Sequence, residues 1–149
     1  MPDDLYYLQL ALDEARASAA AGEIPIGAVL VHNDAVLARS GNRTIRDNDP
    51  TAHAEIIVIR EASRLLCNYR LADTVLYVTL EPCAMCAGAI VQARVPRLVY
   101  AADDSKGGAF RSCFELLTCP KLNHQVEVTS GLLAEDSTAL LQSFFASRR

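Results

Sequence analysis

The stretch "DTVLYVTLEPCAMCAGAIVQARVPRLVYAA" at positions 73–102 decides the fold class of this 149-residue chain. It starts with an apolar, β-rich run, continues as a small-residue helical run that stops before Pro96, and ends in a second β-rich run. Strands that are joined through a helix lie parallel in one sheet. The stretch therefore predicts a strand, a helix and a parallel strand, which is the repeating unit of α/β proteins.

Strand-like and helical runs also alternate on the N-terminal side of this stretch. Apolar residues in 3–22 are spaced for one face of a helix, with an aspartate before it as a possible cap. The runs "IPIGAVLVHN" and "AVLARSG" flank Asn33 and Asp34, which predicts an antiparallel hairpin with a tight turn. A further helical run follows Asp49 and Pro50, which we interpret as its cap and a residue of its first turn.

On the C-terminal side, a polar loop "DDSKGGAFRSC" precedes a late strand in "HQVEVTSG" and a final helix in "LAEDSTALLQSFFASRR". With the runs before it, this order predicts a mixed five-stranded sheet flanked by helices in three layers, α/β/α. We found no repeat or linker, and we expect a single domain over residues 1–149.

The composition limits the class of protein. Half of the residues are hydrophobic (51%), which excludes a disordered chain. No signal peptide is recognisable, and no run reaches the roughly 20 apolar residues of a membrane span. We therefore expect a soluble, cytoplasmic protein without a membrane partner. The net charge of −4 argues against nonspecific coating of nucleic acid.

Two of the five cysteines stand in the motif "EPCAMC" at 81–86. Cys83 and Cys86 are three positions apart at the start of a helix, where the free N–H groups stabilise a thiolate. An odd number of cysteines without a secretory signal argues against a disulfide framework and favours metal or catalytic use. From this motif alone, a redox pair, a metal site and an incidental pair all stay open.

The motif "TAHAE" at 51–55 favours the metal site. His53 lies at the start of another helix that follows a strand, so two helix N-termini could bring His53, Cys83 and Cys86 to one Zn²⁺. Three protein ligands leave the fourth tetrahedral position to water, as in catalytic zinc sites. Taken separately, His53 could be a hydrogen-bonded surface residue, and Glu55 an acid that favours the helix dipole.

A closed structural zinc site is the remaining alternative, and spacing does not exclude it. The fourth ligand would then be one of five other residues, none of which lies within a few positions of the cluster: Cys67, Cys113, Cys119, His32 or His124. A structural site has no need for an acid beside its histidine, however, and the sequence places Glu55 there.

Glu55 gives the open site a chemistry. Zinc lowers the pKa of its bound water to about 7, and a carboxylate that is not a ligand can accept the proton and pass it on. His-x-Glu with Pro-Cys-x-x-Cys is the signature of zinc deaminases of nucleobases. The sequence contains both parts, and therefore predicts hydrolytic removal of an exocyclic amine as ammonia.

Over nearly its whole length the chain resembles the bacterial tRNA-specific adenosine deaminases. The resemblance lies in "GEIPIGAVLV", "PTAHAEI", "LYVTLEPCAMCAGAIVQARV", "DDSKGG", "LNHQVEV" and "LLQSFFASRR". It implies a cytidine deaminase-like fold and conversion of the wobble adenosine in the anticodon loop of an arginine tRNA to inosine. It also implies a homodimer with one Zn²⁺ per subunit and no nucleotide cofactor.

The same resemblance implies roles for particular residues. It places zinc on His53, Cys83 and Cys86 and makes Glu55 the proton shuttle. The nucleotide and anticodon-loop contacts that it implies are Asn42, Asp103, Asp104, Lys106, Asn123, Phe145 and Arg149. A basic rim could add to them from Arg43, Arg46, Lys106, Arg111, Lys121, Arg148 and Arg149.

Three positions depart from the pattern of the family. Arg111 stands where a smaller residue is usual, Cys113 where an aliphatic one is, and Ser105 where proline is. These departures concern the shape of the loop and not the chemistry.

Two other functions are compatible with parts of the sequence. A deaminase of free guanine, cytosine or cytidine would share every catalytic residue but would not need the basic, aromatic final helix. A zinc-stabilised RNA-binding protein without catalysis would not need Glu55.

Overall fold

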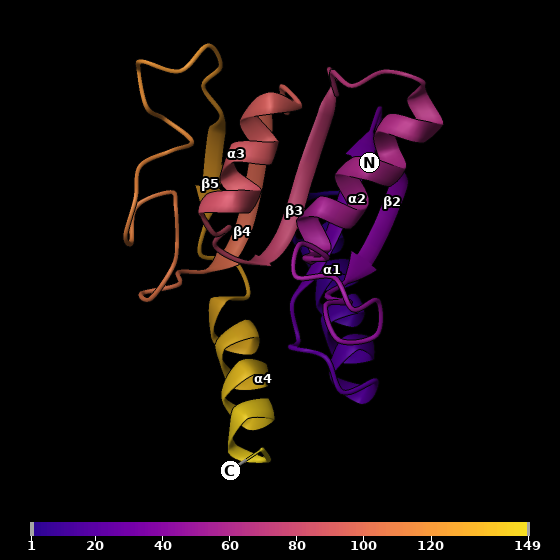
Figure 1. Cartoon of the computed structure of the whole chain (residues 1–149), viewed down its shortest axis with the longest axis vertical. Helices are drawn as coiled ribbons and strands as arrows, with labels where there is room; N and C mark the ends of the chain where they lie inside the picture. Colours follow the sequence, from indigo (N-terminus) through magenta and orange to yellow (C-terminus); the bar gives the residue numbers. More distant parts are fainter. Residues whose placement is uncertain (1, 149) are drawn as a thin grey trace.

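Five strands form one mixed sheet in the computed structural model, which describes residues 2–148 (Figure 1). The strand order is β2-β1-β3-β4-β5; β1 is antiparallel to both neighbours, and β3, β4 and β5 are parallel. The strands are β1 (Gly27–His32), β2 (Ala35–Gly41), β3 (Thr74–Leu80), β4 (Arg97–Ala102) and β5 (Glu127–Ser130). The predicted antiparallel hairpin and the predicted parallel strands are confirmed.

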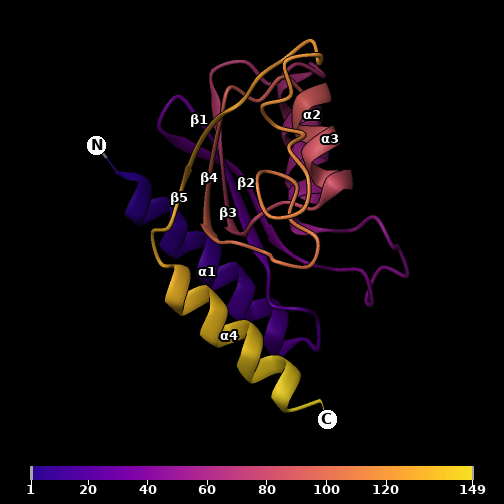
Figure 2. The same cartoon turned by 90° about the vertical axis from the view of Figure 1, so that its left-hand side faces the viewer.

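Helices cover both faces of the sheet, which confirms the three-layer α/β/α prediction (Figure 2). The helices are α1 (Asp4–Ala20), α2 (Ala54–Leu66), α3 (Ala84–Gln92) and α4 (Ala134–Ala146). Helices α1 and α4 lie side by side on one face, and α2 and α3 lie on the other. Within residues 2–148, no helix combines the length and the apolar character needed to cross a membrane.

Two hydrophobic clusters hold the layers together, one on each face of the sheet. On the α1 face, Leu8 packs with Val29 and Val99. On the α2 and α3 face, Val58 and Ile90 belong to a larger cluster that runs along the sheet. Each fully buried aliphatic side chain of this size stabilises the fold by about 1.5–3 kcal/mol.

The hairpin turn and the first helix form as the sequence predicts. Asn33 and Asp34 have φ angles of 49° and 63°, the pair of positive values that a two-residue type I′ turn requires. Asp3 caps α1, because its Oδ1 accepts a hydrogen bond from the Tyr6 N–H at 3.0 Å.

The start of α2 differs from the prediction. Asp49 and Pro50 are not at the helix start, because α2 begins at Ala54 and its N-cap is His53. Asp49 instead accepts hydrogen bonds on Oδ1 from the N–H (2.8 Å) and the hydroxyl (2.7 Å) of Thr51. The N–H groups of Ala52 and His53 donate to the carbonyls of Asp49 (3.1 Å) and Thr51 (2.8 Å), which are tight-turn bonds and not helical ones, so the helix begins only after His53.

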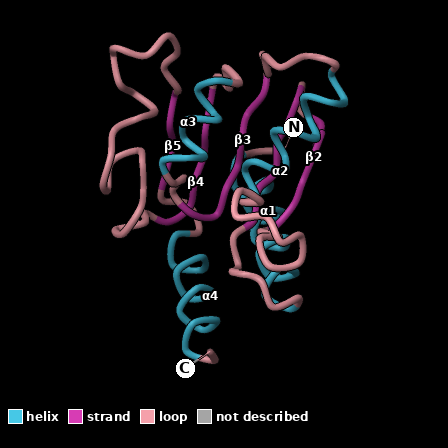
Figure 3. The backbone as a smooth tube through the Cα atoms, in the orientation of Figure 1, coloured by secondary structure: helices cyan, strands magenta, loops and turns pink. Residues whose placement is uncertain are grey.

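The topology gathers several element ends at one edge of the molecule. Strands β2, β3 and β4 run in the same direction, and α2 and α3 begin at the loops that follow β2 and β3 (Figure 3). The long loop 103–126 leaves the same end of β4 before the chain returns to β5. Ligands of open α/β sheets bind outside the carboxyl ends of the strands, and this edge is such a place.

Candidate functional site

Two helix N-termini bring the predicted metal ligands together. His53 is the N-cap of α2, Cys83 is the N-cap of α3, and Cys86 lies in the first turn of α3. The His53 Nδ1 atom is 3.6 Å from the Cys83 Sγ atom and 3.5 Å from the Cys86 Sγ atom. One ligand atom from each residue lies within 4.8 Å of the others.

These donors fit a zinc ion. Zinc takes thiolate and imidazole ligands at about 2.3 Å and 2.0–2.1 Å, and tetrahedral bonds of these lengths separate the ligand atoms by distances like those seen between His53 and the two sulfurs. In residues 2–148 the cluster comprises those three side chains. It contains none of the five residues considered as a fourth ligand of a closed structural site, so the geometry favours an open site.

The two thiols are electrostatically coupled. A hydrogen bond from the Cys86 thiol lowers the pKa of Cys83 to about 4, and the same contact together with burial raises the pKa of Cys86. This contact favours the thiolate form of Cys83 and the thiol form of Cys86. A divalent cation that binds both sulfurs displaces the remaining proton, so the affinity of the site rises with pH.

Glu55 lies beside this cluster in a nearly dry position. Its side chain is buried in the first turn of α2, with 4% of the residue exposed. Burial raises the pKa of the Glu55 carboxyl to about 7. A carboxyl group with this pKa can both accept and donate a proton at neutral pH, as a proton shuttle must. Glu55 lines a cavity of 80 Å³ together with His53, Cys83, Ile26, Leu80, Glu81 and Asp104.

Asn42 fixes the start of α2 next to His53. It is buried, and its Oδ1 accepts a hydrogen bond from the Ala54 N–H at 2.9 Å. Its backbone carbonyl accepts from the Ser18 hydroxyl at 3.1 Å and from Arg46 Nη2 at 3.0 Å. The structure thus places Asn42 beside the metal-ligand cluster and gives it a structural contact as well.

A wider groove adjoins the small cavity and collects the other predicted nucleotide contacts. It has a volume of 570 Å³, and it runs from loop 103–106 to α4. Asp103, Asp104, Lys106 and Phe145 all line it, although Phe145 is about 40 positions away in the sequence. Ile26, Leu80 and Asp104 line both the groove and the small cavity, so the two lie next to each other.

The two neighbouring phenylalanines of α4 have different surroundings. Phe145 is 47% exposed at the groove, whereas Phe144 is half-buried with the Arg148 guanidinium 4.6 Å from its ring centre. The exposed ring of Phe145 is a surface on which a base can stack, whereas the ring of Phe144 is covered by Arg148.

One predicted contact, Asn123, is not brought to the groove. Asn123 is exposed, and the next residue, His124, holds its Nε2 2.7 Å from the Val95 carbonyl, just before the start of β4. That is the opposite end of β4 from loop 103–106. Arg149 lies outside the described residues.

Several residues of the predicted basic rim are held by acids. Arg111 pairs with Asp103 at 3.1 Å, and Asp103 also accepts from the Tyr100 hydroxyl at 2.6 Å. Arg43 pairs with Asp47, also at 3.1 Å. Asp103 is thus engaged by Arg111, one of the three positions at which the sequence departs from the family pattern.

Sequence reasoning missed two buried carboxylates beside the site. Glu23 accepts hydrogen bonds from the N–H groups of Ile45 (3.1 Å) and Arg46 (2.8 Å), and so orders the loop between β2 and α2. Glu81 does the same for the loop after β4. The available signal was an acid inside each of the apolar stretches "GEIPIG" and "TLEPC", where burial requires a partner.

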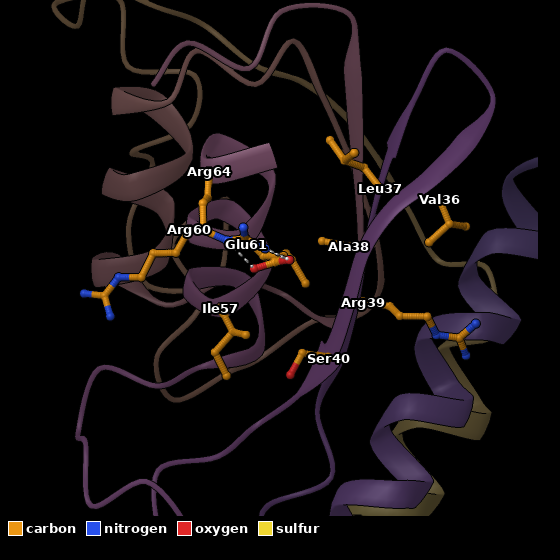
Figure 4. Close-up of a pocket in the computed structure, with 10 residues that line it drawn as sticks. Val36, Leu37, Ala38, Arg39, Ser40, Ile57, Arg60, Glu61 and Arg64 are labelled. Atoms are coloured by element: carbon orange, nitrogen blue, oxygen red, sulfur yellow. Dashed lines mark hydrogen bonds and ion pairs between the residues drawn. The ribbon is translucent and has the colours of Figure 1, made fainter. Parts of the chain in front are cut away.

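A second cavity, of 740 Å³, lies between β2 and α2 and holds none of the predicted site residues (Figure 4). Its floor includes Ala38 and Ile57. At its rim Arg64 and Glu61 form an ion pair at 2.6 Å. This cavity has no cluster of acid, base and metal-binding groups, so the chemistry belongs to the edge where α2 and α3 begin.

Comparison with known protein families shows that the relatives of this chain are deaminases. The family described as MafB19-like deaminase matches residues 2–149. The chain is similar to the tRNA-specific adenosine deaminase of Agrobacterium fabrum, with 50% identity over 100% of this chain and 98% of that protein. The enzyme of that name from Haemophilus influenzae is 50% identical over 95% of this chain and 83% of that protein.

Solved structures give the same picture. A structure from a study of A-to-I editing by tRNA:A34 deaminases at the wobble position has a TM-score of 0.88 and 52% identity, over 91% of this chain and 98% of that chain. The guanine deaminase of Bacillus subtilis has a TM-score of 0.66 and 35% identity, over 99% of this chain and 94% of that chain.

Proposed function

The chain belongs to the family of tRNA-specific adenosine deaminases, and from that premise we propose that it converts the wobble adenosine of a tRNA anticodon loop to inosine. Water replaces the exocyclic amine of adenine, which leaves as ammonia. The observation that carries this proposal is the buried Glu55 carboxyl beside the cluster of His53, Cys83 and Cys86.

We propose that His53, Cys83 and Cys86 hold one Zn²⁺ per subunit. Zinc bound there would supply the activation of water, whose pKa it lowers to about 7. Glu55 accepts one proton of the attacking water and gives it to the ring nitrogen next to the reacting carbon. It then takes the second water proton from the hydroxyl group added to that carbon and passes it to the amine, so that ammonia leaves and a carbonyl remains. The apolar side chains of Ile26 and Leu80 line the same cavity and keep bulk water from Glu55.

The groove accounts for recognition of RNA and not of a free base. A base that acts as substrate must leave the stack of the anticodon loop, so its neighbours also need a place to bind. We propose that the flipped adenine enters the cavity of Glu55 beside Asn42 and Asp104. Lys106 would then meet the phosphate backbone, and the exposed ring of Phe145 would stack on a neighbouring base.

The family resemblance supports three further contacts with the tRNA, from Asp103, Asn123 and Arg149. We propose that Asp103 contacts the substrate after exchange of its Arg111 partner. Asn123, which lies at the opposite end of β4, and Arg149 are proposed to contact the anticodon arm.

We further propose a cytoplasmic homodimer with arginine tRNA as its substrate. A shallow, largely apolar groove between α2 and α3 supports the dimer, because exposed apolar surface of this kind marks protein interfaces. Ile59, Ala89 and Ala93 line it together with Tyr69, which is 69% exposed. Sedimentation equilibrium of the purified chain tests this proposal: a mass of one chain at micromolar concentration contradicts it.

Incubation with a pool of unmodified tRNAs tests the function and its breadth together. Inosine is read as guanosine during reverse transcription, so sequencing locates every converted adenosine. We expect conversion at the wobble position of arginine tRNA and at no other adenosine. Conversion in several tRNAs keeps the reaction and overturns the arginine specificity. A pool that stays unconverted contradicts the function.

A further inference from the structure

Glu81 binds both ends of a loop with one buried carboxylate. It follows β3 directly and is 2% exposed. Its Oε1 accepts hydrogen bonds from the Asp104 N–H (3.0 Å) and the Ser112 hydroxyl. Its Oε2 accepts from the N–H groups of Phe110 (3.0 Å), Arg111 (3.0 Å) and Ser112 (3.1 Å). Five donors from segment 104–112 therefore converge on a single side chain.

The segment is packed against Glu81 so closely that only glycine fits at its centre. A Cβ at Gly108 would overlap the Glu81 carboxylate. Gly108 also forms a β-bridge with Cys83, and the Ala109 N–H donates to the Pro82 carbonyl at 2.8 Å. The loop is thus attached to the turn that carries the first cysteine of the cluster.

This attachment determines where one wall of the site stands. Asp104 lines both the small cavity and the groove, and Lys106 lines the groove two residues later. Apart from β4, which ends at Ala102, Glu81 is the main anchor of this segment among the described contacts. Without the carboxylate, the backbone N–H groups of 110–112 lose their acceptor and the wall loses its fixed position.

We propose that Glu81 is a positioning residue for the substrate. Its carboxylate holds segment 104–112 as the wall of the base cavity and groove, so that it sets how tightly the RNA binds while Glu55 carries the proton transfer. This inference rests on the proposed function for the identity of the substrate. The position of the loop follows from the contacts of Glu81 and is independent of the proposed function.

Glu81→Gln is the direct test, because glutamine has nearly the same size as glutamate. Both carboxylate oxygens accept hydrogen bonds from N–H groups, so the side-chain amide directs its NH₂ toward an N–H donor in either orientation. Glu115→Gln is the matched control, since it makes the same chemical change in an exposed acid three residues beyond Ser112.

We expect the variant to raise the KM for an anticodon stem-loop about tenfold or more, the loss expected for hydrogen bonds to a charged group. The kcat should stay within about threefold of the parent value, because Glu55 is untouched. Zinc content should remain at the parent level. Hydrogen exchange at the amides of Asp104, Phe110, Arg111 and Ser112 should accelerate, while exchange in β4 should not.

A merely structural role predicts a different pattern. It would lower kcat through a smaller active fraction, with an unchanged KM and with exchange accelerated throughout the sheet. That pattern overturns the proposal, and so does normal exchange at the four loop amides. If the variant does not fold, Ser112→Ala takes its place, because it removes one hydroxyl donor and should shift KM and loop exchange in the same direction by less.

The two hypotheses fail in distinguishable ways. A parent protein that leaves the stem-loop unconverted contradicts the proposed function, whatever the loop exchange shows. A parent that converts the stem-loop, together with a Glu81→Gln variant of unchanged KM, contradicts the positioning role alone.

Discussion

Glu55 combines burial with a pKa close to neutrality, and this combination makes its role testable. Replacing Glu55 with alanine removes the group that moves protons and leaves the metal ligands in place. We expect Glu55→Ala to lower turnover of the stem-loop by about 10²–10⁴-fold. Zinc content and RNA affinity should be retained. Single-turnover kinetics, elemental analysis and a binding titration measure these three quantities.

The control for this change lies on the same helix. Glu61 is partly exposed on α2 and pairs with Arg64, and it does not line the cavity that contains Glu55. Glu61→Ala should leave turnover unchanged. Near-normal deamination by Glu55→Ala would sink the proposed mechanism and would favour an RNA-binding protein without catalysis.

Asp4 gives a pH dependence that is independent of the metal. A hydrogen-bonded pair with Arg97, at 2.6 Å, lowers the pKa of the Asp4 carboxyl below its usual value of 3.8. Because the folded-state pKa is lowered, the stabilisation is fully present above pH 3.8 and disappears as the pH falls through the folded-state value. We expect Asp4→Asn to lower the unfolding free energy at pH 7 by about 1 kcal/mol.

Urea denaturation of the parent and the Asp4→Asn variant at pH 7 and at pH 3 measures this difference. Zinc loss in acid affects both proteins alike, so the comparison stands. The difference should shrink at pH 3, and a difference of the same size at both pH values contradicts the assignment. Asp13→Asn, which breaks an exposed pair with Arg16, should have little effect at either pH.

The stability of the two helix N-termini that meet at the cluster should depend on bound metal. Cys83→Ala removes a ligand, so we expect loss of zinc and of stability together, since part of the binding free energy is folding free energy. The loss approaches about 4 kcal/mol when free zinc stands at 1,000 times the Kd. Thermal unfolding with and without a chelator, combined with zinc analysis, measures it.

A chelator should bring the parent protein down to the stability of the Cys83→Ala variant and leave the variant itself unchanged. Cys67→Ala is the control, because Cys67 is exposed at the far end of α2 and should not affect zinc content. Full zinc occupancy in Cys83→Ala would contradict the ligand assignment.

Helix α4 should contribute to RNA binding through its exposed ring. Stacking of a base on an aromatic side chain contributes about 1–3 kcal/mol, so Phe145→Ala should weaken binding of the stem-loop by about 5–150-fold. The thermal stability of the Phe145→Ala variant should change little, because the ring is exposed. Phe144→Ala should do the reverse, with a lower melting temperature and a smaller change in affinity. An unchanged Kd for Phe145→Ala contradicts the stacking role.

At this scale the sequence predicts most elements and fails where distant contacts decide. The strand–helix–strand unit 73–102 forms as its pattern predicts, since apolar periodicity is local information. The predicted start of α2 was wrong. Asp49 accepts a hydrogen bond from the Thr51 N–H in a turn, and the sequence of such a turn resembles that of a helix start. The role of Glu81 depends on donors 23 to 31 positions away, and no local pattern contains them.

For the whole molecule, the strand order explains why the site stands where it does. β3 lies between antiparallel β1 and parallel β4, so the helix after β3 and the loop after β4 leave the sheet at one edge. Helix α2 begins at the same edge after β2. The metal ligands come from the two helix starts, and the groove comes from the loop and α4. Their juxtaposition therefore follows from topology and not from proximity in sequence.

Deamination by the purified zinc-loaded protein distinguishes a tRNA substrate from a free base or nucleoside. An arginine-tRNA anticodon stem-loop with adenosine at the wobble position is one substrate, and free adenosine, guanine, cytosine and cytidine are incubated in parallel. We expect inosine at the wobble base and no ammonia from the free compounds. Ammonia from guanine or another free compound, with the stem-loop unchanged, would keep the hydrolytic chemistry and contradict the tRNA substrate.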